Sequence, residues 1–172
     1  MSKCPGRDNM PDETWFRNNF LSQAKVIWKS SLIDKLSLDV VIRDQKYYMS
    51  LGYLPSQNPM AFDDTLVRMP SHATLYVSTK LMDKPTVFMM ALLRHEAVHL
   101  GYPRHDEGFR KVCQLHNIPM TESNYEKGEF EVMRKEGSRY VLLKSFKTFD
   151  EANNFATQQA GANPGTRYRI RY

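Results

Sequence analysis

The sequence predicts an α+β fold in which helices pack on a small mixed or antiparallel sheet, with a further small module at the C-terminal end. Three observations lead to this prediction. Residues 12–35 and 85–100 repeat their apolar side chains every three or four positions, which is the period of a helix with a buried face. Short segments rich in β-branched and apolar residues lie between them and are typical of strands. After residue 128 the pattern becomes strand, strand, helix, strand.

Length and composition agree with this arrangement. The chain has 172 residues, of which 41% are hydrophobic, enough for one domain with a small appendage. No apolar run reaches the roughly 18 residues of a membrane span. The first residues are polar and lack the apolar core of a signal peptide, and two distant cysteines make no disulfide framework. We therefore expect a cytoplasmic protein.

The opening helix is predicted from Asp12 to about Lys35, after a flexible tail at residues 1–11. Its apolar residues share one face and are expected to enter the core. They are Trp15, Phe16, Phe20, Ala24, Ile27, Trp28 and Leu32.

Strands are expected next along the chain, at residues 38–42, 47–51 and 73–78. The stretch from Gly52 to Pro70 separates the second strand from the third. It contains three prolines and little periodicity, so we predict a loop at the rim of a cleft.

The helix that begins near Pro85 contains the most informative residues of the chain. Proline suits the first position of a helix, and the apolar residues that follow predict a buried one. His95 and His99 are four residues apart, so one face of the helix presents both imidazoles to the same metal ion. Glu96 lies beside them, placed to accept a proton from a zinc-bound water. This is the H-E-x-x-H pattern of two zinc ligands and one general base.

His105 is the predicted third ligand. Gly101 and Pro103 end the helix, so the chain can turn and bring His105 to the open side of the ion, and Asp106 suits the N-cap of a new helix. Three imidazoles favour zinc over harder ions, and catalytic zinc has three protein ligands and one open position. The alternative is a chance match, since a histidine on an apolar helix is commonly a core residue. The nearby third histidine favours the metal site.

The run HEAVHLGYPRHDEGF, residues 95–109, resembles the active-site segment of the SprT-like zinc metallopeptidases. In that family an H-E-x-x-H helix is followed by a short loop, a third histidine and, four residues later, a phenylalanine, here Phe109. The strand and turn at residues 73–81 are also similar to the segment that precedes the family's active-site helix. The resemblance covers residues 66–116 well and residues 12–65 only loosely.

The resemblance implies a zincin-like core over residues 12–120 and an intracellular peptidase, and some members of the family act on proteins bound to DNA. Some members end in a four-cysteine zinc ribbon, which this chain lacks, since it has only two cysteines. The metzincins also place a third histidine six residues after the second, but their glycine falls one position later than Gly101, and they are mostly secreted. The roles that the SprT-like resemblance assigns are zinc ligation by His95, His99 and His105 and base catalysis by Glu96.

Residues 129–172 are predicted to form a ββαβ module after a linker at residues 121–128. Thr148 and Glu151 have the capping-box spacing that begins a helix. Residues 134–172 contain eight basic and three acidic residues, a net charge of +5 that equals the net charge of the whole chain. A basic surface confined to one small module is typical of a nucleic-acid contact. The alternative is that the arginines only solvate an exposed sheet face. The candidate contact residues are Arg139, Lys144, Arg167, Arg169 and Arg171.

The expected function is a zinc-dependent endopeptidase that acts on a protein or peptide, with nucleic acid as a second partner and no membrane. Glu96 would take a proton as the zinc-activated water attacks a peptide carbonyl, and would pass it to the leaving amine. Tyr102 and Arg104 are candidate oxyanion donors, and the strand at residues 73–78 is expected to be an edge strand that pairs with an extended substrate. The alternatives are a nucleic-acid-binding or scaffolding protein with a catalytically silent zinc-stabilised core, and a regulatory protease that docks one partner through the basic module.

Overall fold

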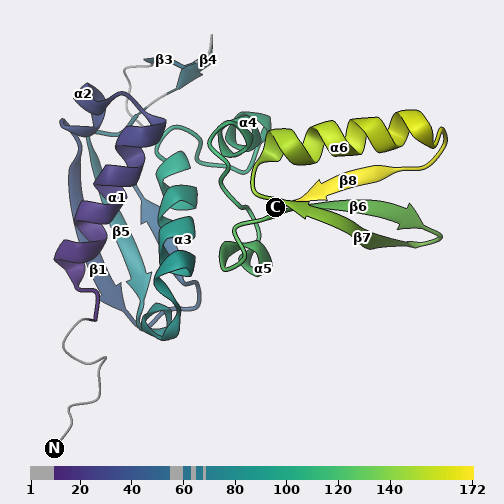
Figure 1. Ribbon diagram of the computed structural model, residues 1–172. Helices are drawn as coiled ribbons and strands as arrows, with labels where there is room; N and C mark the ends of the chain where they lie inside the picture. The colour runs from purple at the N-terminus through teal and green to yellow at the C-terminus, as the bar shows by residue number, and fades with distance from the viewer. Residues whose placement is uncertain (1–9, 55–59, 63–64, 68) are drawn as a thin grey trace, which may run out of the picture. The chain divides into compact units, whose positions relative to one another are not determined.

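The computed structural model describes residues 10–54, 60–62, 65–67 and 69–172 (Figure 1). Helices and small sheets alternate along the chain, so the predicted α+β class is confirmed. The chain divides into two compact units, one ending at Arg104 and one beginning at His105. The sequence-based prediction had placed the end of the first domain at residue 120. In the described part of the chain, no helix has the length and apolar character needed to span a membrane.

The first unit is built on a three-stranded sheet with the strand order β1-β5-β2. β1 (Ser37–Arg43) runs parallel to β5 (His72–Ser78), and β2 (Met49–Gly52) runs antiparallel to it. The prediction that the strand at 73–78 is an edge strand is therefore wrong, because β5 has a partner on each side. Among the described residues, β1 and β2 are the edges of this sheet.

Two helices, α1 (Glu13–Ile27) and α3 (Thr86–Val98), pack against each other and along the sheet (Figure 1). The carboxylate of Asp12 caps α1 by accepting a hydrogen bond from the backbone N–H of Trp15 at 2.8 Å. Phe16 and Phe20 are completely buried, as their helical spacing predicted. The core of this unit therefore lies between the sheet and the two helices.

The single helix predicted over residues 12–35 is interrupted at Trp28. α1 ends at Ile27, Trp28 has extended backbone angles (φ −113°, ψ 161°), and the short helix α2 (Ser30–Ile33) follows. The indole of Trp28 is only 4% exposed, and its Nε1–H donates a hydrogen bond to the carbonyl of Ala97 at 2.9 Å. This long-range contact overrides the local helical pattern, which identified the buried residues but not the break.

The predicted loop between Gly52 and Pro70 contains two short antiparallel strands, β3 (Met60–Phe62) and β4 (Thr65–Val67). The rest of that prediction falls largely outside the described residues. After β5, a 3₁₀ helix, η1 (Thr79–Asp83), leads into α3.

The second unit begins with α4 (Glu107–Leu115) and the short helix α5 (Glu122–Tyr125), which lies in the predicted linker. Four elements follow in the predicted order: β6 (Phe130–Glu136), β7 (Arg139–Phe146), α6 (Phe149–Ala162) and β8 (Tyr168–Arg171). The strands form an antiparallel sheet in the order β7-β6-β8, with α6 on one face (Figure 1). Phe130, Val132 and Ala152 form the core between sheet and helix, surrounded by partly buried aromatic residues.

Candidate metal centre

The helix α3 provides a rigid, largely dry mount for the predicted ligands. Pro85 precedes its first residue, close to the predicted start. Most of its residues are buried. The predicted ligand His95 is 5% exposed, and the predicted base Glu96 is 7% exposed. A water-poor environment of this kind strengthens the electrostatic interactions of any charge placed there.

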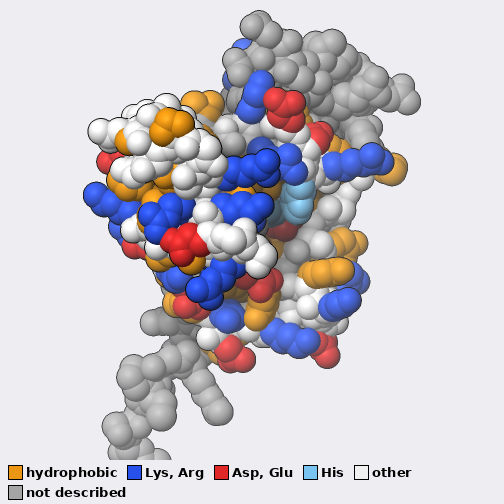
Figure 2. Space-filling view, turned by 90° about the vertical axis from the view of Figure 1, so that its right-hand side faces the viewer, with side chains coloured by type: hydrophobic (Ala, Val, Ile, Leu, Met, Phe, Trp, Pro, Cys, Tyr) orange, Lys and Arg blue, Asp and Glu red, His pale blue; other side chains and the backbone are white. Residues whose placement is uncertain are grey.

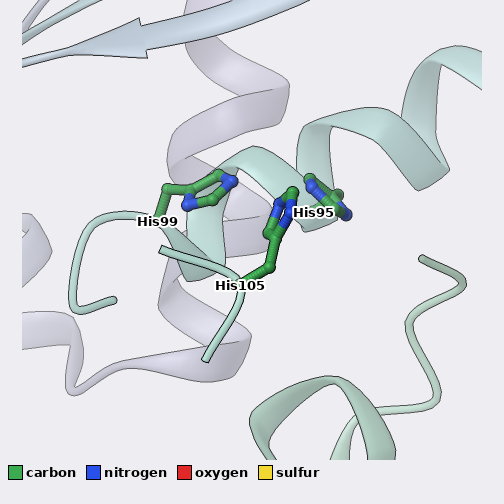
Figure 3. A group of neighbouring side chains, drawn as sticks. All are labelled: His95, His99 and His105. Carbon is green, nitrogen blue, oxygen red and sulfur yellow. The ribbon is translucent and has the colours of Figure 1, made fainter. Parts of the chain in front are cut away.

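The three predicted ligands converge. The nitrogen atoms that His95, His99 and His105 could offer to a metal all lie within 4.8 Å of one another. In Figure 3, His95 and His99 project from α3, and His105 reaches toward them from the segment that follows the helix. Three neutral imidazoles are a donor set suited to zinc, copper or nickel. The residues present therefore fit a transition-metal site.

A hydrogen bond sets the orientation of one ligand. His99 Nδ1 lies 2.9 Å from the carbonyl oxygen of Tyr102. If Nδ1–H donates to this carbonyl, the lone pair stays on Nε2, where a metal can use it. The short loop after α3 thus places a hydrogen-bond acceptor, the Tyr102 carbonyl, next to Nδ1 of His99.

The same loop passes closely over the indole of Trp28. A Cβ atom on Gly101 would lie 2.3 Å from Trp28 Cη2, and the indole is held by its bond to the Ala97 carbonyl. Glycine is needed here because of this close approach, and not because of a left-handed backbone conformation. Any side chain at this position would push the loop that leads to His105 away from the Trp28 indole.

The residue predicted to be the third ligand, His105, lies just before α4, as expected. His105 is exposed, and its ring packs edge-on against that of Phe109, with 4.7 Å between the ring centroids. The carboxylate of Asp106 caps α4 by accepting a hydrogen bond from the Phe109 N–H at 2.9 Å, which confirms the predicted N-cap. The cap fixes where the helix starts and, with it, the backbone next to His105.

A cavity of about 290 Å³ opens beside Glu96 and His99. Its remaining lining comes from β2, from Tyr53 just after β2, and from Pro103 in the loop: Met49, Ser50, Leu51, Tyr53 and Pro103. The two candidate oxyanion donors are not part of this lining in the described residues. The ring of Tyr102 is buried near Trp28, with 6.2 Å between the ring centroids, and Arg104 is exposed.

Tyr53 is the site residue that sequence analysis missed. Its hydroxyl donates a hydrogen bond to the carbonyl of His99. Burial, and then the negative charge of Glu96, raise the pKa of Tyr53 to about 12, so the hydroxyl stays protonated at neutral pH. No local pattern identifies Tyr53, because its position follows from the pairing of β2 with β5.

Burial raises the pKa of Glu96 to about 8. In the metal-free protein this carboxyl is therefore largely protonated at neutral pH. A cation nearby favours the ionised form and lowers the pKa again. Burial and a bound cation thus have opposite effects on the pKa of Glu96.

The remaining histidines and the described cysteine lie apart from this cluster. His72 begins β5 and pairs with the carboxylate of Asp39 at 3.3 Å. His116 caps the end of α4, and burial lowers its pKa. Cys113 is fully buried, and burial raises its pKa to about 12.

The basic residues predicted to contact nucleic acid do not all share one surface. Arg169 and Arg171 alternate with the core residue Ile170 on β8, so they point away from α6. Lys144 pairs with Val132, a core residue, and its Nζ lies over the rings of Phe146 and Phe155, so Lys144 belongs to the helix-covered side. Arg139 lies at the turn between β6 and β7.

Comparison of the chain with known protein families, with curated proteins and with solved structures found no match.

Proposed function

We propose that the protein is a zinc-dependent endopeptidase with a zincin-like, SprT-like catalytic core. The observation that supports this most directly is the convergence of three histidines beside a buried glutamate that lines a cavity. When bound, zinc would polarise a substrate carbonyl and activate a water molecule for attack. A structural metal site needs no glutamate facing a cavity, so Glu96 favours catalysis over a silent core.

In this proposal Glu96 moves the proton. It accepts a proton as the water attacks and delivers it to the leaving amine. Its burial leaves the ionised form poorly solvated, and a neighbouring cation offsets that effect. The two opposing effects bring its pKa toward the neutral range, where a group that must both accept and donate a proton works best.

The substrate in this proposal is an extended peptide that lies along β2. Met49, Ser50 and Leu51 line the cavity, and β2 is an edge of its sheet among the described residues. An edge strand binds a peptide through backbone hydrogen bonds, which makes recognition largely independent of sequence. β2 thus takes the role that the sequence had suggested for β5.

Metal analysis combined with digestion tests the proposal. We expect purified protein to contain about one zinc per chain, as catalytic sites do, and to cleave casein. A chelator should abolish cleavage, and added zinc should restore it. Zinc binding without cleavage of any protein would instead favour the alternative of a catalytically silent, zinc-stabilised core.

Tyr53 is proposed to stabilise the oxyanion. Its hydroxyl faces the cavity near Glu96. During the reaction it would move its hydrogen bond from the His99 carbonyl to the oxygen of the substrate on which negative charge develops. We expect Tyr53→Phe to lower kcat by about 10²-fold, the scale seen when one oxyanion donor is removed, with little change in KM.

Zinc content and melting temperature separate this role from a structural one. If Tyr53 only ties the end of β2 to α3, Tyr53→Phe would lower the melting temperature and leave kcat close to that of the wild type.

A further inference from the structure

We propose that β1 is a docking edge through which two copies of this chain join their sheets. This inference concerns the first unit by itself and does not depend on the peptidase proposal. β1 has β5 on one side and, among the described residues, no strand on the other. All seven of its residues, from Ser37 to Arg43, pair with β5 in one continuous register. The strand is therefore regular along its whole length.

This edge lacks most of the features that keep strand edges from pairing. Proteins protect such edges with lysine, proline, β-bulges or a covering element. β1 has the sequence SLDVVIR, with neither lysine nor proline, and its register with β5 has no bulge. Its two charged residues, Asp39 and Arg43, have opposite signs. An edge of this kind is a template for a further strand.

The alternation of the backbone shows which groups of β1 are available. The N–H of Ser37 donates to the carbonyl of Ser71 at 2.9 Å, so the peptide groups of Ser37 face β5. Every second residue of the strand repeats this direction, and the residues between them present their N–H and C=O groups to the outer edge. Val40 and Ile42 are therefore the residues that can hydrogen-bond to a further strand.

Charge selects one register for a second copy. In an antiparallel pair with its two-fold axis at Val41, Val40 of each copy lies opposite Ile42 of the other, and the two residues exchange both N–H···O bonds. Asp39 of each copy then lies opposite Arg43 of the other. Non-hydrogen-bonded pairs of this kind bring Cα atoms to about 4.5 Å, where opposite charges attract. The strand is thus complementary to itself, as a two-fold interface requires.

Neighbouring registers of the same two strands are less favourable. An axis at Asp39 would set two carboxylates against each other, and an axis at Arg43 would do the same with two guanidinium groups. Axes at Val40 or Ile42 leave both charges opposite uncharged residues. The register centred on Val41 is the one that pairs them.

The side chains that would meet are accessible and held in place. They lie on the face of the sheet that α1 and α3 do not cover (Figure 1). Asp39 is 64% exposed and Val41 is 37% exposed. The carboxylate of Asp39 lies 3.3 Å from His72 Nε2, and the guanidinium carbon of Arg43 lies 4.2 Å from the centroid of the Tyr76 ring. These contacts keep both charges on the outer face, within reach of a cross-strand partner.

Arg17 limits the length of the ladder and adds a further pair of charges. Its Nε donates to the outward carbonyl of Leu38 at 3.1 Å, so that carbonyl is already occupied. In the proposed register Leu38 lies opposite Asp44 of the second copy, an exposed residue just beyond β1. The guanidinium of Arg17 would thus meet a carboxylate of the second copy where the ladder ends.

The basic surface of the second unit suits a second copy less well. Figure 2 looks at this unit from the end at which the β6–β7 hairpin turns, and Lys and Arg side chains outnumber Asp and Glu side chains there. Two copies of such a surface repel each other. β1 carries one charge of each sign, and the cavity beside β2 lies at the opposite edge of the sheet, so both copies keep it open.

The test uses charge reversal and its rescue in the full chain. Asp39→Arg and Arg43→Asp each set like charges opposite each other in a homodimer. The double variant restores opposite charges in reversed order, and an equimolar mixture of the two single variants restores them in a heterodimer. Asp150→Arg is the matched control, since it makes the same charge change at an exposed position of α6. Sedimentation velocity at low salt, where surface charges are least screened, measures association.

We expect the wild-type chain and Asp150→Arg to dimerise with a Kd on the order of 10–100 μM, because an interface of one strand per copy is small. Each single reversal should raise the Kd at least about 10-fold, since it changes two cross-strand pairs from attraction to repulsion. The double variant and the mixture should dimerise about as well as the wild type. Circular dichroism verifies that every variant is folded.

Disulfide trapping checks the register. Val41 would lie opposite its own counterpart at a Cα distance of about 4.5 Å, which a disulfide can bridge. Ser37 would lie roughly 26 Å from its counterpart, eight residues further along the ladder. In a Cys4→Ser background, Val41→Cys should therefore form a covalent dimer under mild oxidation, and Ser37→Cys should not.

Several results would overturn the proposal. The first is a wild-type chain that stays monomeric at about 1 mM, well above the expected Kd. The second is a dimer that neither charge reversal weakens, which would form through another surface. The third is weakening by both reversals without rescue in the double variant or in the mixture. Equal trapping of Ser37→Cys and Val41→Cys would also contradict the register.

Discussion

Glu96→Gln is expected to abolish peptide hydrolysis while zinc stays bound. The amide keeps nearly the same shape at this 7%-exposed position but cannot accept a proton, and general acid–base catalysis contributes about 10²–10⁴-fold to rate. Casein digestion, followed as release of acid-soluble peptides, measures the loss, and metal analysis measures the zinc. If the variant keeps its activity, Glu96 is not the general base. If the variant loses its zinc, Glu96 supports metal binding, and the loss of activity says nothing about proton transfer.

The pH dependence of stability provides a test of Glu96 that does not require enzymatic activity. In the metal-free protein the pKa of this carboxyl rises from 4.5 to about 8 on folding, so between these values the folded state holds a proton that the unfolded state has lost. Stability of the metal-free wild type should therefore fall as pH rises from about 4.5 to 8. The metal-free Glu96→Gln protein should lack this contribution and should melt at a higher temperature than the metal-free wild type at pH 8.

His105→Ala is expected to remove both zinc and activity without unfolding the chain. His105 is exposed, so little packing is lost, but the metal loses one of its three protein ligands. Changes to the groups that merely surround ligands already lower metal affinity by about 10–100-fold, so loss of a ligand should exceed that range. Competition with a zinc-binding dye measures the affinity.

His72→Ala is the matched control for this prediction. It removes a histidine that begins β5 and pairs only with Asp39 among the ion pairs described. Zinc affinity and activity should be unchanged. If His105→Ala binds zinc as tightly as His72→Ala does, the third ligand has been assigned wrongly, and the case for a catalytic site on α3 loses its main support.

Elements with strong local signals were predicted well from the sequence. The apolar helix after Pro85, the cap at Asp106 and the order of strands and helix in the C-terminal module all follow from spacing and capping chemistry within a few residues. The meeting of His95, His99 and His105 also follows locally, because one helix face and one short loop bring them together.

Features that depend on distant parts of the chain were not predicted. β5 lies in the centre of its sheet because it pairs with both β1 and β2, and the order of strands across a sheet does not follow from their order along the chain. Tyr53 reaches the site because β2, which it follows, pairs with β5. The break at Trp28 requires an acceptor, the Ala97 carbonyl, that lies 69 residues away in sequence.

The grouping of the basic residues was predicted in part. Alternation along the last strand identified Arg167, Arg169 and Arg171 as neighbours on one face. The same reasoning applied to Lys144 would have excluded it, since Phe146 lies two residues further on and packs against the core. The prediction grouped the five residues by their charge. In the sheet, alternate residues of a strand lie on opposite faces, and this separates Lys144 from Arg169 and Arg171.

The packing of Trp28 against Gly101 gives the protein a built-in optical reporter. Its indole contacts the last turn of α3 through Ala97 and the following loop through Gly101, so its environment changes whenever the ligand loop shifts. The chain contains only one other tryptophan, Trp15. Replacing Trp15 with phenylalanine would leave an emission spectrum that comes from Trp28 alone, and metal loading could then be followed in real time without any attached dye.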